Sequence, residues 1–485
     1  MNLQGDKKMN NQYNTRAIMA SLLICGFVGM FSETALNIAI TNLMEEFQIS
    51  AATAQWLTTG YLLTLGIIMP ISGLLLQMFT TRQMFTGSLI SFIVGTLIGA
   101  LALNFEMLMF ARVLQAAGMA LLLPLLFNTV LVIYPPQKRG VAMGFVGLVI
   151  MFAPAIGPTI SGLLIEYLTW NYIFWLSLPF LIIGLLIGLK YLENVTDVTK
   201  ARIDLLSVAL STIGFGGVVF GFSKAGEGAE GWSSMVVVTS IIVGLVALVL
   251  FILRQNLMDN PMMNLSVFKY PMYVTGLLLV LSCMIFVMSS MIILPMFLQT
   301  GAGLSVFISG LMLLPGSALN GILGPLVGRL FDKYGPKWLV IPGLVLVAVV
   351  LWFFTTLSPA SSVVFIVALH TGLMVGICMI WMPAQTNGLN QLPPELYPHG
   401  TAVLNSLQQV AGAIGIAVAI SILTNGKEKY LHGSSDPTKL TEIASATTAG
   451  AQSVFWFMLI IALIGLILGF FIRRVVNHEE RYSAH

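Results

Sequence analysis

Long apolar runs fill most of the sequence, and short polar or Gly- and Pro-containing breaks separate them. A helix needs about 20 mostly apolar residues to cross the hydrocarbon of a bilayer. The runs therefore predict an all-α polytopic membrane protein. We expect fourteen spans, at residues 17–40, 56–76, 84–103, 105–126, 140–165, 172–189, 205–222, 235–253, 272–298, 308–327, 338–357, 363–382, 402–423 and 453–472.

The composition supports the same fold class. Hydrophobic residues make up 57% of the 485 residues and charged residues only 8%, whereas soluble domains carry roughly 25% charge. This excludes an ordinary soluble enzyme, and the apolar residues suffice for at most about 14 spans. The net charge of +3 is small and dispersed, so we expect no nucleic-acid partner.

The sequence carries no sign of a metal, a cofactor or an enzyme. Cys25, Cys283 and Cys378 all lie inside apolar runs without CxxC spacing, which predicts neither a disulfide frame nor a metal site. Motifs of the P-loop, HExxH and nucleophile-elbow types are absent. Nucleotide hydrolysis within this chain is therefore excluded as a source of energy, which leaves ion gradients.

The basic residues favour one side of the membrane. With loops assigned alternately to the two sides, 17 of the 22 Lys and Arg residues fall on the side that holds both termini, four fall on the other side, and Arg112 lies inside a span. Loops rich in Lys and Arg mark the cytoplasmic side. We therefore expect a plasma-membrane protein with both termini in the cytoplasm. The first span follows no cleavage site, and we expect it to be retained, with the mature chain beginning near Met1.

An internal repeat divides the chain. The segment GLLLQMFTTR at residues 73–82 resembles GRLFDKYGPK at residues 328–337, eight spans later. This spacing predicts an N-terminal six-helix bundle at 1–190, two inserted helices with linkers at 191–270, and a C-terminal six-helix bundle at 271–485. Parallel six-span repeats are typical of transporters.

The repeated segments also supply a candidate cytoplasmic gate. Its members are Gly73, Arg82, Gly328, Asp332 and Gly335. We expect Asp332 to accept hydrogen bonds from Lys333, Arg329 or a neighbouring helix end, and so to close a latch. The first copy has Gln77 at the position of Asp332, which predicts a weaker latch on the N-terminal half.

Glu33 is the one acidic residue deep inside an apolar run. A carboxylate in hydrocarbon costs at least about 3 kcal/mol, so we expect Glu33 to face a protein-lined or watery cavity. Burial favours its neutral form and a nearby cation favours its charged form, which suits it to take up and release a proton. A static charge that holds helices together is the alternative.

Arg112 is the one basic residue inside a run. Glu33 and Arg112 each lie about seven residues from the outer end of their predicted span, which places both about 10 Å below the outer surface. We therefore expect the two to meet if their helices are neighbours. The alternative is a structural arginine that bonds backbone carbonyls.

The fifth predicted span has a distinctive pattern, GLVIMFAPAIGPTISG at residues 147–162. Prolines bend a membrane helix, and small residues let another backbone approach closely. The pattern suits a packed seam between moving elements, although a generic proline-kinked helix is the alternative. The residues that define it are Gly147, Pro154, Gly157, Pro158 and Gly162.

Several side chains are candidates for contact with substrate. Methionine repacks easily around varied ligands, and the apolar candidates for cavity walls are Met151, Phe152, Met288, Met291, Phe297 and Trp381. The polar candidates are Asn37, Gln55, Tyr61 and Gln115. Ordinary bundle packing is the alternative for each. His370 is a second candidate proton carrier, or else a hydrogen-bonded scaffold residue.

The motifs resemble those of a known family. The run RVLQAAGMALLLP from Arg112, the fifth-span run and the 328–337 loop are similar to signature motifs of the major facilitator superfamily. FSETALNIAITNLM from Phe31 resembles the first-span motif of its fourteen-span drug:proton antiporter branch, with Glu33 where many members have Asp. TTRQ at Thr80 looks most like the lincomycin-resistance type of exporter.

The resemblance implies a fold and a function. It implies two six-helix bundles that rock around a central cavity, with Glu33 as the coupling carboxylate and Arg112 as the residue that tunes it. The implied partners are protons, small amphipathic drugs and membrane lipids, with the protein acting as a monomer. An exporter of one endogenous metabolite or lipid is a second hypothesis, and a non-transporting membrane sensor is a third.

Overall fold

The computed structural model describes residues 14–195, 204–227, 231–259, 261–434, 436–437 and 439–475, and helices are the regular elements in these ranges. The first group is α1 (Thr15–Ala35), η2 (Leu36–Ala39), α2 (Ile40–Phe47), α3 (Ala51–Met78), α4 (Thr81–Ala100), α5 (Phe105–Ile133), η3 (Pro136–Lys138), α6 (Arg139–Tyr167) and α7 (Tyr172–Tyr191). The inserted group is α8 (Leu205–Glu227), η4 (Gly231–Ser233) and α9 (Met235–Leu257). The last group is η5 (Leu265–Lys269), α10 (Pro271–Met296), η6 (Phe297–Gly301), α11 (Val306–Tyr334), α12 (Lys337–Phe354), α13 (Val363–Asn390), η7 (Pro394–Leu396), α14 (Tyr397–His432) and α15 (Leu440–Phe470).

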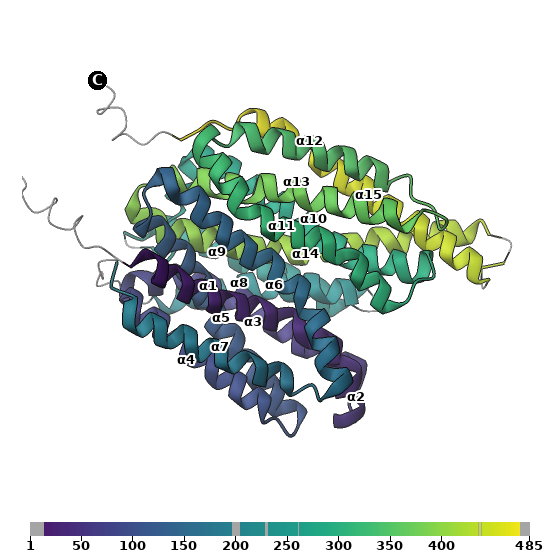
Figure 1. Cartoon of the computed structure of the whole chain (residues 1–485), viewed down its shortest axis with the longest axis horizontal. Helices are drawn as coiled ribbons and strands as arrows, with labels where there is room; N and C mark the ends of the chain where they lie inside the picture. Colours follow the sequence, from purple (N-terminus) through teal and green to yellow (C-terminus); the bar gives the residue numbers. More distant parts are fainter. Residues whose placement is uncertain are drawn as a thin grey trace, which may run out of the picture.

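Fourteen helices among the described residues are long and apolar enough to cross a membrane. This confirms the predicted number of spans and the all-α polytopic fold class. Helices α1 to α7 form one bundle and α10 to α15 form the other, with α8 and α9 packed beside them (Figure 1). We call the end at which α1 begins and α15 finishes the terminal end, and the opposite end the far end.

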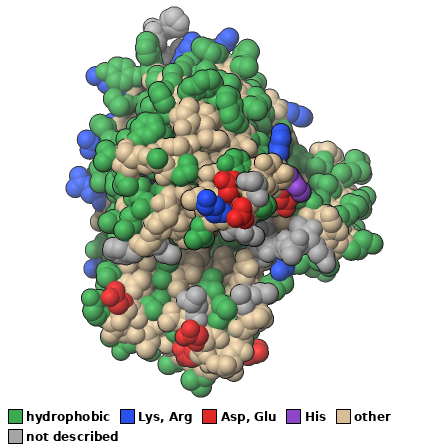
Figure 2. Space-filling model, turned by 90° about the vertical axis from the view of Figure 1, so that its right-hand side faces the viewer, with side chains coloured by type: hydrophobic (Ala, Val, Ile, Leu, Met, Phe, Trp, Pro, Cys, Tyr) green, Lys and Arg blue, Asp and Glu red, His purple; other side chains and the backbone are tan. Residues whose placement is uncertain are grey.

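The two bundles touch closely near the terminal end and separate toward the far end. Two pairs of helices make most of the contact between them, α6 with α11 and α3 with α14. Nearer the far end, a Cβ atom added at Gly162 of α6 or at Gly310 of α11 would meet no atom within 4 Å. Figure 2 looks onto the far end and shows the surface hollowed between the bundles. The molecule is therefore closed at one end and open at the other.

The polar stretch at residues 425–450 lies between the predicted spans at 402–423 and 453–472, and its polarity predicts a solvated loop. It is mostly helical, so that prediction was wrong. Helix α14 continues to His432 and α15 begins at Leu440, and together they reach beyond the other helices at the far end (Figure 1). Charged residues such as Lys427 and Glu428 are good helix formers. Their polarity marks where the chain leaves the hydrocarbon and not where the helix ends.

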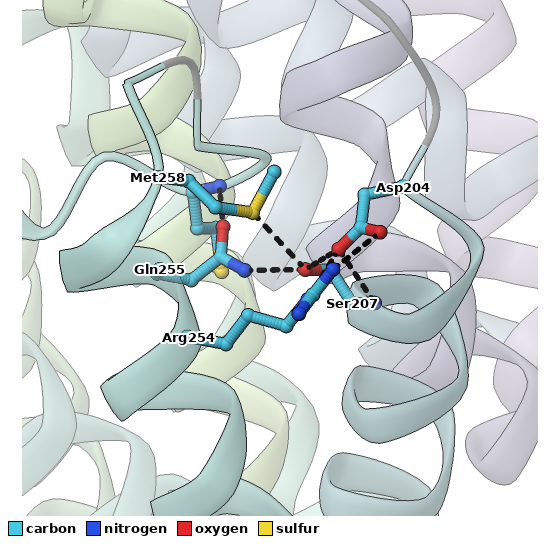
Figure 3. Close-up of polar contacts among 6 residues, drawn as sticks. Asp204, Ser207, Arg254, Gln255 and Met258 are labelled. Atoms are coloured by element: carbon cyan, nitrogen blue, oxygen red, sulfur yellow. Dashed lines mark hydrogen bonds and ion pairs between the residues drawn. The ribbon is translucent and has the colours of Figure 1, made fainter.

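A polar clamp holds the inserted helices together at the terminal end (Figure 3). Asp204 accepts two hydrogen bonds from Arg254 of α9, at 2.6 and 2.8 Å. The same carboxylate accepts from the backbone N–H and the hydroxyl of Ser207, at 3.1 and 2.5 Å, and so caps the first turn of α8. The clamp thus satisfies one helix end and fixes it to the last turn of the other.

The clamp predicts a pH-dependent contribution to stability. Hydrogen bonds from Arg254 and Ser207 hold the pKa of the Asp204 carboxyl well below its ordinary value. Because the pKa is lower in the folded chain, the stabilisation is present above the unfolded pKa of about 3.9 and is lost as the pH falls below it. We expect Asp204→Asn to lower the unfolding temperature in detergent at pH 7, and the difference from wild type to shrink below about pH 4. Replacement of the exposed Glu428 by Gln is the control, and a difference that persists unchanged in acid would contradict this account.

Candidate functional site

A buried arginine network joins three helices of the N-terminal bundle. The Arg112 side chain on α5 is 1% exposed. One of its terminal nitrogens donates to the Ser32 carbonyl of α1 at 2.9 Å and to Gln115 Oε1 at 3.1 Å. Its Nε donates to the Leu57 carbonyl of α3 at 3.3 Å, and its other terminal nitrogen has no partner. The guanidinium therefore ties α1, α3 and α5 together and keeps one donor unused.

The Ser32 carbonyl is available because the helix changes its winding there. Helix α1 ends at Ala35 and continues as the 3₁₀ segment η2. The N–H of Leu36 bonds to Thr34, whereas a regular α-helix would direct it to Ser32. An unpaired carbonyl in hydrocarbon costs several kcal/mol, and the cation of Arg112 satisfies this one. The same interaction places a positive charge at the negative end of α1.

Glu33 lies next to this bond but does not pair with Arg112. Its side chain is partly exposed, and no hydrogen bond or ion pair joins it to another described residue. Helices α1 and α5 are neighbours, which was the condition for the two residues to meet, but Arg112 bonds a backbone carbonyl, which was the alternative for this residue. The carboxyl group of Glu33 is therefore unpaired among the described residues.

Tyr61 of α3 completes the network. Its ring lies under the guanidinium of Arg112, with 4.1 Å from Cζ to the ring centroid. The side chain is fully buried, and its hydroxyl group has no partner. Such stacking stabilises a desolvated cation by about 2 kcal/mol. Tyr61 is thus placed to hold Arg112, although it was expected to contact substrate.

The other polar candidates are divided between this network and the far end. Gln115 accepts from Arg112 and donates to Thr96 of α4 at 2.9 Å, so its amide is fully engaged. Asn37 is exposed and accepts from Thr58 at 2.7 Å, while Gln55 is partly exposed. Asn37 and Gln55 therefore lie nearer the open end.

The glycine and proline motif of α6 packs directly on the segment that holds Glu33. Pro158 lacks the N–H that would pair with the Pro154 carbonyl, and the Thr34 hydroxyl donates to that carbonyl at 3.0 Å instead. A Cβ atom at Gly157 would lie 2.5 Å from the same hydroxyl oxygen, so only glycine permits this approach. Glu33 thus sits between Ser32, bonded to α5, and Thr34, bonded to α6.

The terminal end is closed by the seam between α6 and α11. Asp332 accepts from the N–H groups of Gly140 and Val141 at 2.8 and 3.1 Å, and so caps α6 from the opposite bundle. Gly140 and Gly328 face each other along this seam without room for a side chain. A neighbouring helix end was one of the three partners expected for Asp332.

The seam between α3 and α14 is the counterpart of this contact and lacks the latch. A Cβ atom at Gly73 would lie 3.1 Å from the Pro398 carbonyl and 2.9 Å from Ala402. Pro398 occupies the place that Gly140 has in the other seam, and proline offers no N–H to a capping group. Gln77, in the place of Asp332, donates to the Gly73 carbonyl of its own helix at 2.9 Å. The asymmetry therefore involves both the acceptor and the donor.

The remaining two gate candidates shape the ends of helices. Arg82 donates to the Leu189 carbonyl of α7, and its backbone N–H donates to Asn194, so it stays within the N-terminal bundle. Gly335 ends α11 with a φ of +82°, a conformation that favours glycine. Arg474 donates to the Asp332 carbonyl at 3.1 Å beside it.

Arg139, at the first turn of α6, is a cross-bundle residue that the sequence analysis counted only among the loop cations. It donates to Asn390 Oδ1 at 2.7 Å and to the Tyr397 hydroxyl at 3.2 Å, both in the C-terminal bundle. The sequence does contain a pattern that indicates this contact, because a Pro-Pro pair precedes α6 and α14 by the same number of residues. The repeat places Arg139 and Tyr397 at equivalent positions.

The apolar candidates do not share one cavity. Met151 and Trp381 line a cavity of about 10 Å³ between the bundles, together with Gly147 and the thiol-bearing Cys378. This is room for about one water molecule. Phe152 packs against Gly321 across the seam. Inside the C-terminal bundle, Met288 packs against Gly412 and Phe297 is fully buried, whereas Met291 is 41% exposed.

His370 is buried against Gly316 of α11, and its Nδ1 has no hydrogen-bond partner. Neither carboxylate of the site, Glu33 or Asp332, bonds to it. The structure therefore separates His370 from the network around Arg112.

Comparisons with known proteins agree with this architecture. The chain is 61% identical over 479 residues to the lincomycin resistance protein LmrB of Bacillus subtilis (strain 168), covering 99% of this chain and 100% of the relative. It is 26% identical over 442 residues to the multidrug export protein EmrB of Escherichia coli (strain K12), covering 90% and 84% of the two chains. The solved structure of the proton:xylose symporter XylE has a TM-score of 0.66 at 14% identity, covers 95% of this chain and 97% of its own, and shows a similar fold.

A family model described as Major Facilitator Superfamily matches residues 22–416. Fourteen spans, two bundles and a match over most of the length agree, and the chain belongs to the Major Facilitator Superfamily.

Proposed function

We propose that this protein is a proton-coupled antiporter that exports amphipathic drugs across the cell membrane. The relatives named for lincomycin resistance and multidrug export support small-molecule drugs as substrates. The observation that carries the coupling is the position of Glu33, an unpaired carboxyl between two segments that bond to other helices. No enzymatic step is part of this function.

The described state corresponds to one half of a transport cycle. We place the terminal end in the cytoplasm because most Lys and Arg residues lie on that side. The closed terminal end and the hollow far end then make this the outward-open state. The N-terminal bundle (residues 14–190) and the C-terminal bundle (residues 271–475) rock about the central cavity. In this state a drug leaves toward the outside and a proton reaches Glu33 from the same side.

The neighbours of Glu33 explain how a proton acts on the gate. Protonation of Glu33 removes a negative charge beside Arg112, and the unpartnered terminal nitrogen of Arg112 is then attracted less strongly toward Glu33. Thr34, the next residue, bonds to α6, and the other end of α6 is the one that Asp332 caps. A shift at Glu33 is therefore transmitted to the latch through a single helix.

The membrane potential provides enough energy for this exchange. A proton that moves inward releases about 2.3 kcal/mol per 100 mV of membrane potential. Each tenfold accumulation costs about 1.4 kcal/mol. One proton per drug molecule thus supports export against a concentration gradient of more than tenfold.

A proton-coupled exporter of one endogenous metabolite or lipid has the same fold and coupling, and fold alone does not separate the two. Export of chemically unrelated drugs favours the multidrug function, while transport confined to one compound favours the alternative. A non-transporting sensor predicts no pH-coupled flux at all. We propose a monomer surrounded by lipid.

The first prediction concerns the carboxyl group. Glu33→Gln resembles the protonated form permanently, so we expect loss of lincomycin uptake into inside-out proteoliposomes driven by a pH gradient. Exchange of labelled for unlabelled drug, which needs no net proton movement, should survive and shows that the protein is folded. The matched control is Glu45→Gln, at an exposed position. Gradient-driven uptake by Glu33→Gln at the wild-type rate would move the coupling elsewhere, with His370 the next candidate.

The second prediction concerns Tyr61. Tyr61→Phe keeps the ring under Arg112 and removes only an unpartnered hydroxyl, so near wild-type flux is expected. Tyr61→Leu removes the stacking and should lower gradient-driven flux by about tenfold. The flux of both variants is measured across a pH series. If Tyr61 touches the drug instead, Tyr61→Leu will raise the KM for lincomycin and leave the pH profile unchanged.

The third prediction concerns the latch. Asp332→Asn weakens the cap on α6, and lost caps cost about 1 kcal/mol, so the terminal end should open about fivefold more often. Cys378 reports this opening because it is 5% exposed and lines the small cavity below the seam. With Cys25 and Cys283 replaced by Ala, maleimide should label Asp332→Asn faster than the control Asp259→Asn, which changes an exposed residue. Equal labelling rates would show that Asp332 does not hold the gate.

A further inference from the structure

The first inserted helix touches both bundles at once. Helix α8 packs against α3 of the N-terminal bundle and α14 of the C-terminal bundle, over the seam where these two helices meet. Helix α9 packs mainly on α8, and its outer face is exposed. A rigid element in contact with two bodies that rotate relative to each other can stay fixed to only one of them.

The contact with α3 combines apolar packing through glycines with one cation–π contact, in which the Lys224 ammonium of α8 lies 5.5 Å from the centre of the Trp56 ring. Val219 of α8 lies beside Gly66 of α3, where an added Cβ atom would be 3.7 Å from the Val219 Cβ atom. A Cβ atom at Gly216 of α8 would lie 3.1 Å from Ile67 of α3. At the far end, Trp56 of α3 stacks on Phe220, with ring centroids 5.8 Å apart. Van der Waals, stacking and cation–π contacts depend less on exact geometry than hydrogen bonds do, so they resist sliding less.

Hydrogen bonds attach the pair to the C-terminal bundle at both ends. At the far end the indole N–H of Trp232, in the connection between α8 and α9, donates to the Ser421 hydroxyl of α14. At the terminal end the backbone N–H of Asn264, just after α9, donates to His399 Nδ1 in the first turn of α14 at 3.2 Å. The two anchors lie on the same helix, one in its first turn and the other well along it toward the far end.

The clamp of Figure 3 makes the pair a single unit. Gln255 of α9 donates to the Ser207 hydroxyl of α8 at 2.7 Å, beside the ion pair of Asp204 and Arg254. The same Gln255 accepts from the backbone N–H of Met263 at 3.1 Å. Met263 precedes Asn264, so the clamp continues directly into the anchor on α14.

We propose that the inserted helices move with the C-terminal bundle and form a seal over the seam between α3 and α14, across which the N-terminal bundle slides. The proposal rests on the alternating access proposed above. The seal keeps lipid out of this seam throughout the cycle. The seam between α6 and α11 has no such cover among the described helices, and apolar side chains on both of its helices, such as Phe145 and Ile322, are exposed beside it.

A disulfide between α3 and α8 tests the sliding. The Cβ separation of 3.7 Å at Gly66 and Val219 fits a disulfide. With the three native cysteines replaced by Ala, we expect oxidised Gly66→Cys/Val219→Cys to lose gradient-driven lincomycin flux and to regain it with a reductant. Each single cysteine variant, treated with the same oxidant, is the control and should keep its flux. Full flux in the cross-linked protein would show that α8 moves with α3, and would overturn the proposal.

A distance measurement gives a readout that does not depend on flux. Spin labels at the lipid-facing positions Val243 of α9, Ile90 of α4 and Ile464 of α15, which are 54%, 50% and 54% exposed, report on the pair and the two bundles. On adding lincomycin and changing the pH, the distance between 243 and 464 should stay constant while that between 243 and 90 changes. Constant values for both pairs, or a change between 243 and 464, would contradict the proposal. Absence of flux in the unmodified protein, with these distance changes present, would count against the antiporter function alone.

Discussion

The structure depends on one constraint, which is that no backbone carbonyl or N–H group can be left unpaired in hydrocarbon. The helices of this protein break that rule locally and repair it with side chains from other helices. Arg112 satisfies the Ser32 carbonyl and Thr34 satisfies the Pro154 carbonyl, while Asp332 satisfies two N–H groups at the start of α6. Each repair is also a bond between helices. The irregular points of the chain are therefore the points at which its helices are connected.

These hydrogen bonds define the path by which Glu33 acts on the gate in the proposed mechanism. Glu33 is flanked by two of them, so a change in its charge acts where α1 is bonded to α5 and α6. The third repair lies at the other end of α6, across the seam to the C-terminal bundle. The second seam has Pro398 in the place of Gly140 and lacks this bond. The seam between α6 and α11 is thus latched by the charged Asp332, while the seam between α3 and α14 is held by packing and covered by α8.

Sequence reasoning identified the spans and the charged residues because hydrocarbon imposes a high cost on each polar group. The number of spans and the similar depth of Glu33 and Arg112 in the membrane follow from that cost. The choice between Glu33 and a backbone carbonyl as the partner of Arg112 did not follow, because no residue pattern indicated the 3₁₀ turn that frees the Ser32 carbonyl. Arg139 was overlooked for a different reason, since its charge counts toward topology whether or not it crosses a seam. The polar helical ends of α14 and α15 were expected as a loop because hydropathy reports solvent and not backbone winding.

The length of α14 has a consequence for observing the molecule at work. Its 36 residues span about 54 Å, whereas the hydrocarbon of a bilayer is about 30 Å thick. Together with α15 it forms an antiparallel arm that reaches beyond the other helices at the far end (Figure 1). Because the arm belongs to one bundle and extends far from its centre, a small rotation of that bundle produces a large displacement at the tip of the arm. A fluorophore carried there would report each turnover from the aqueous phase, without any change to the residues that perform it.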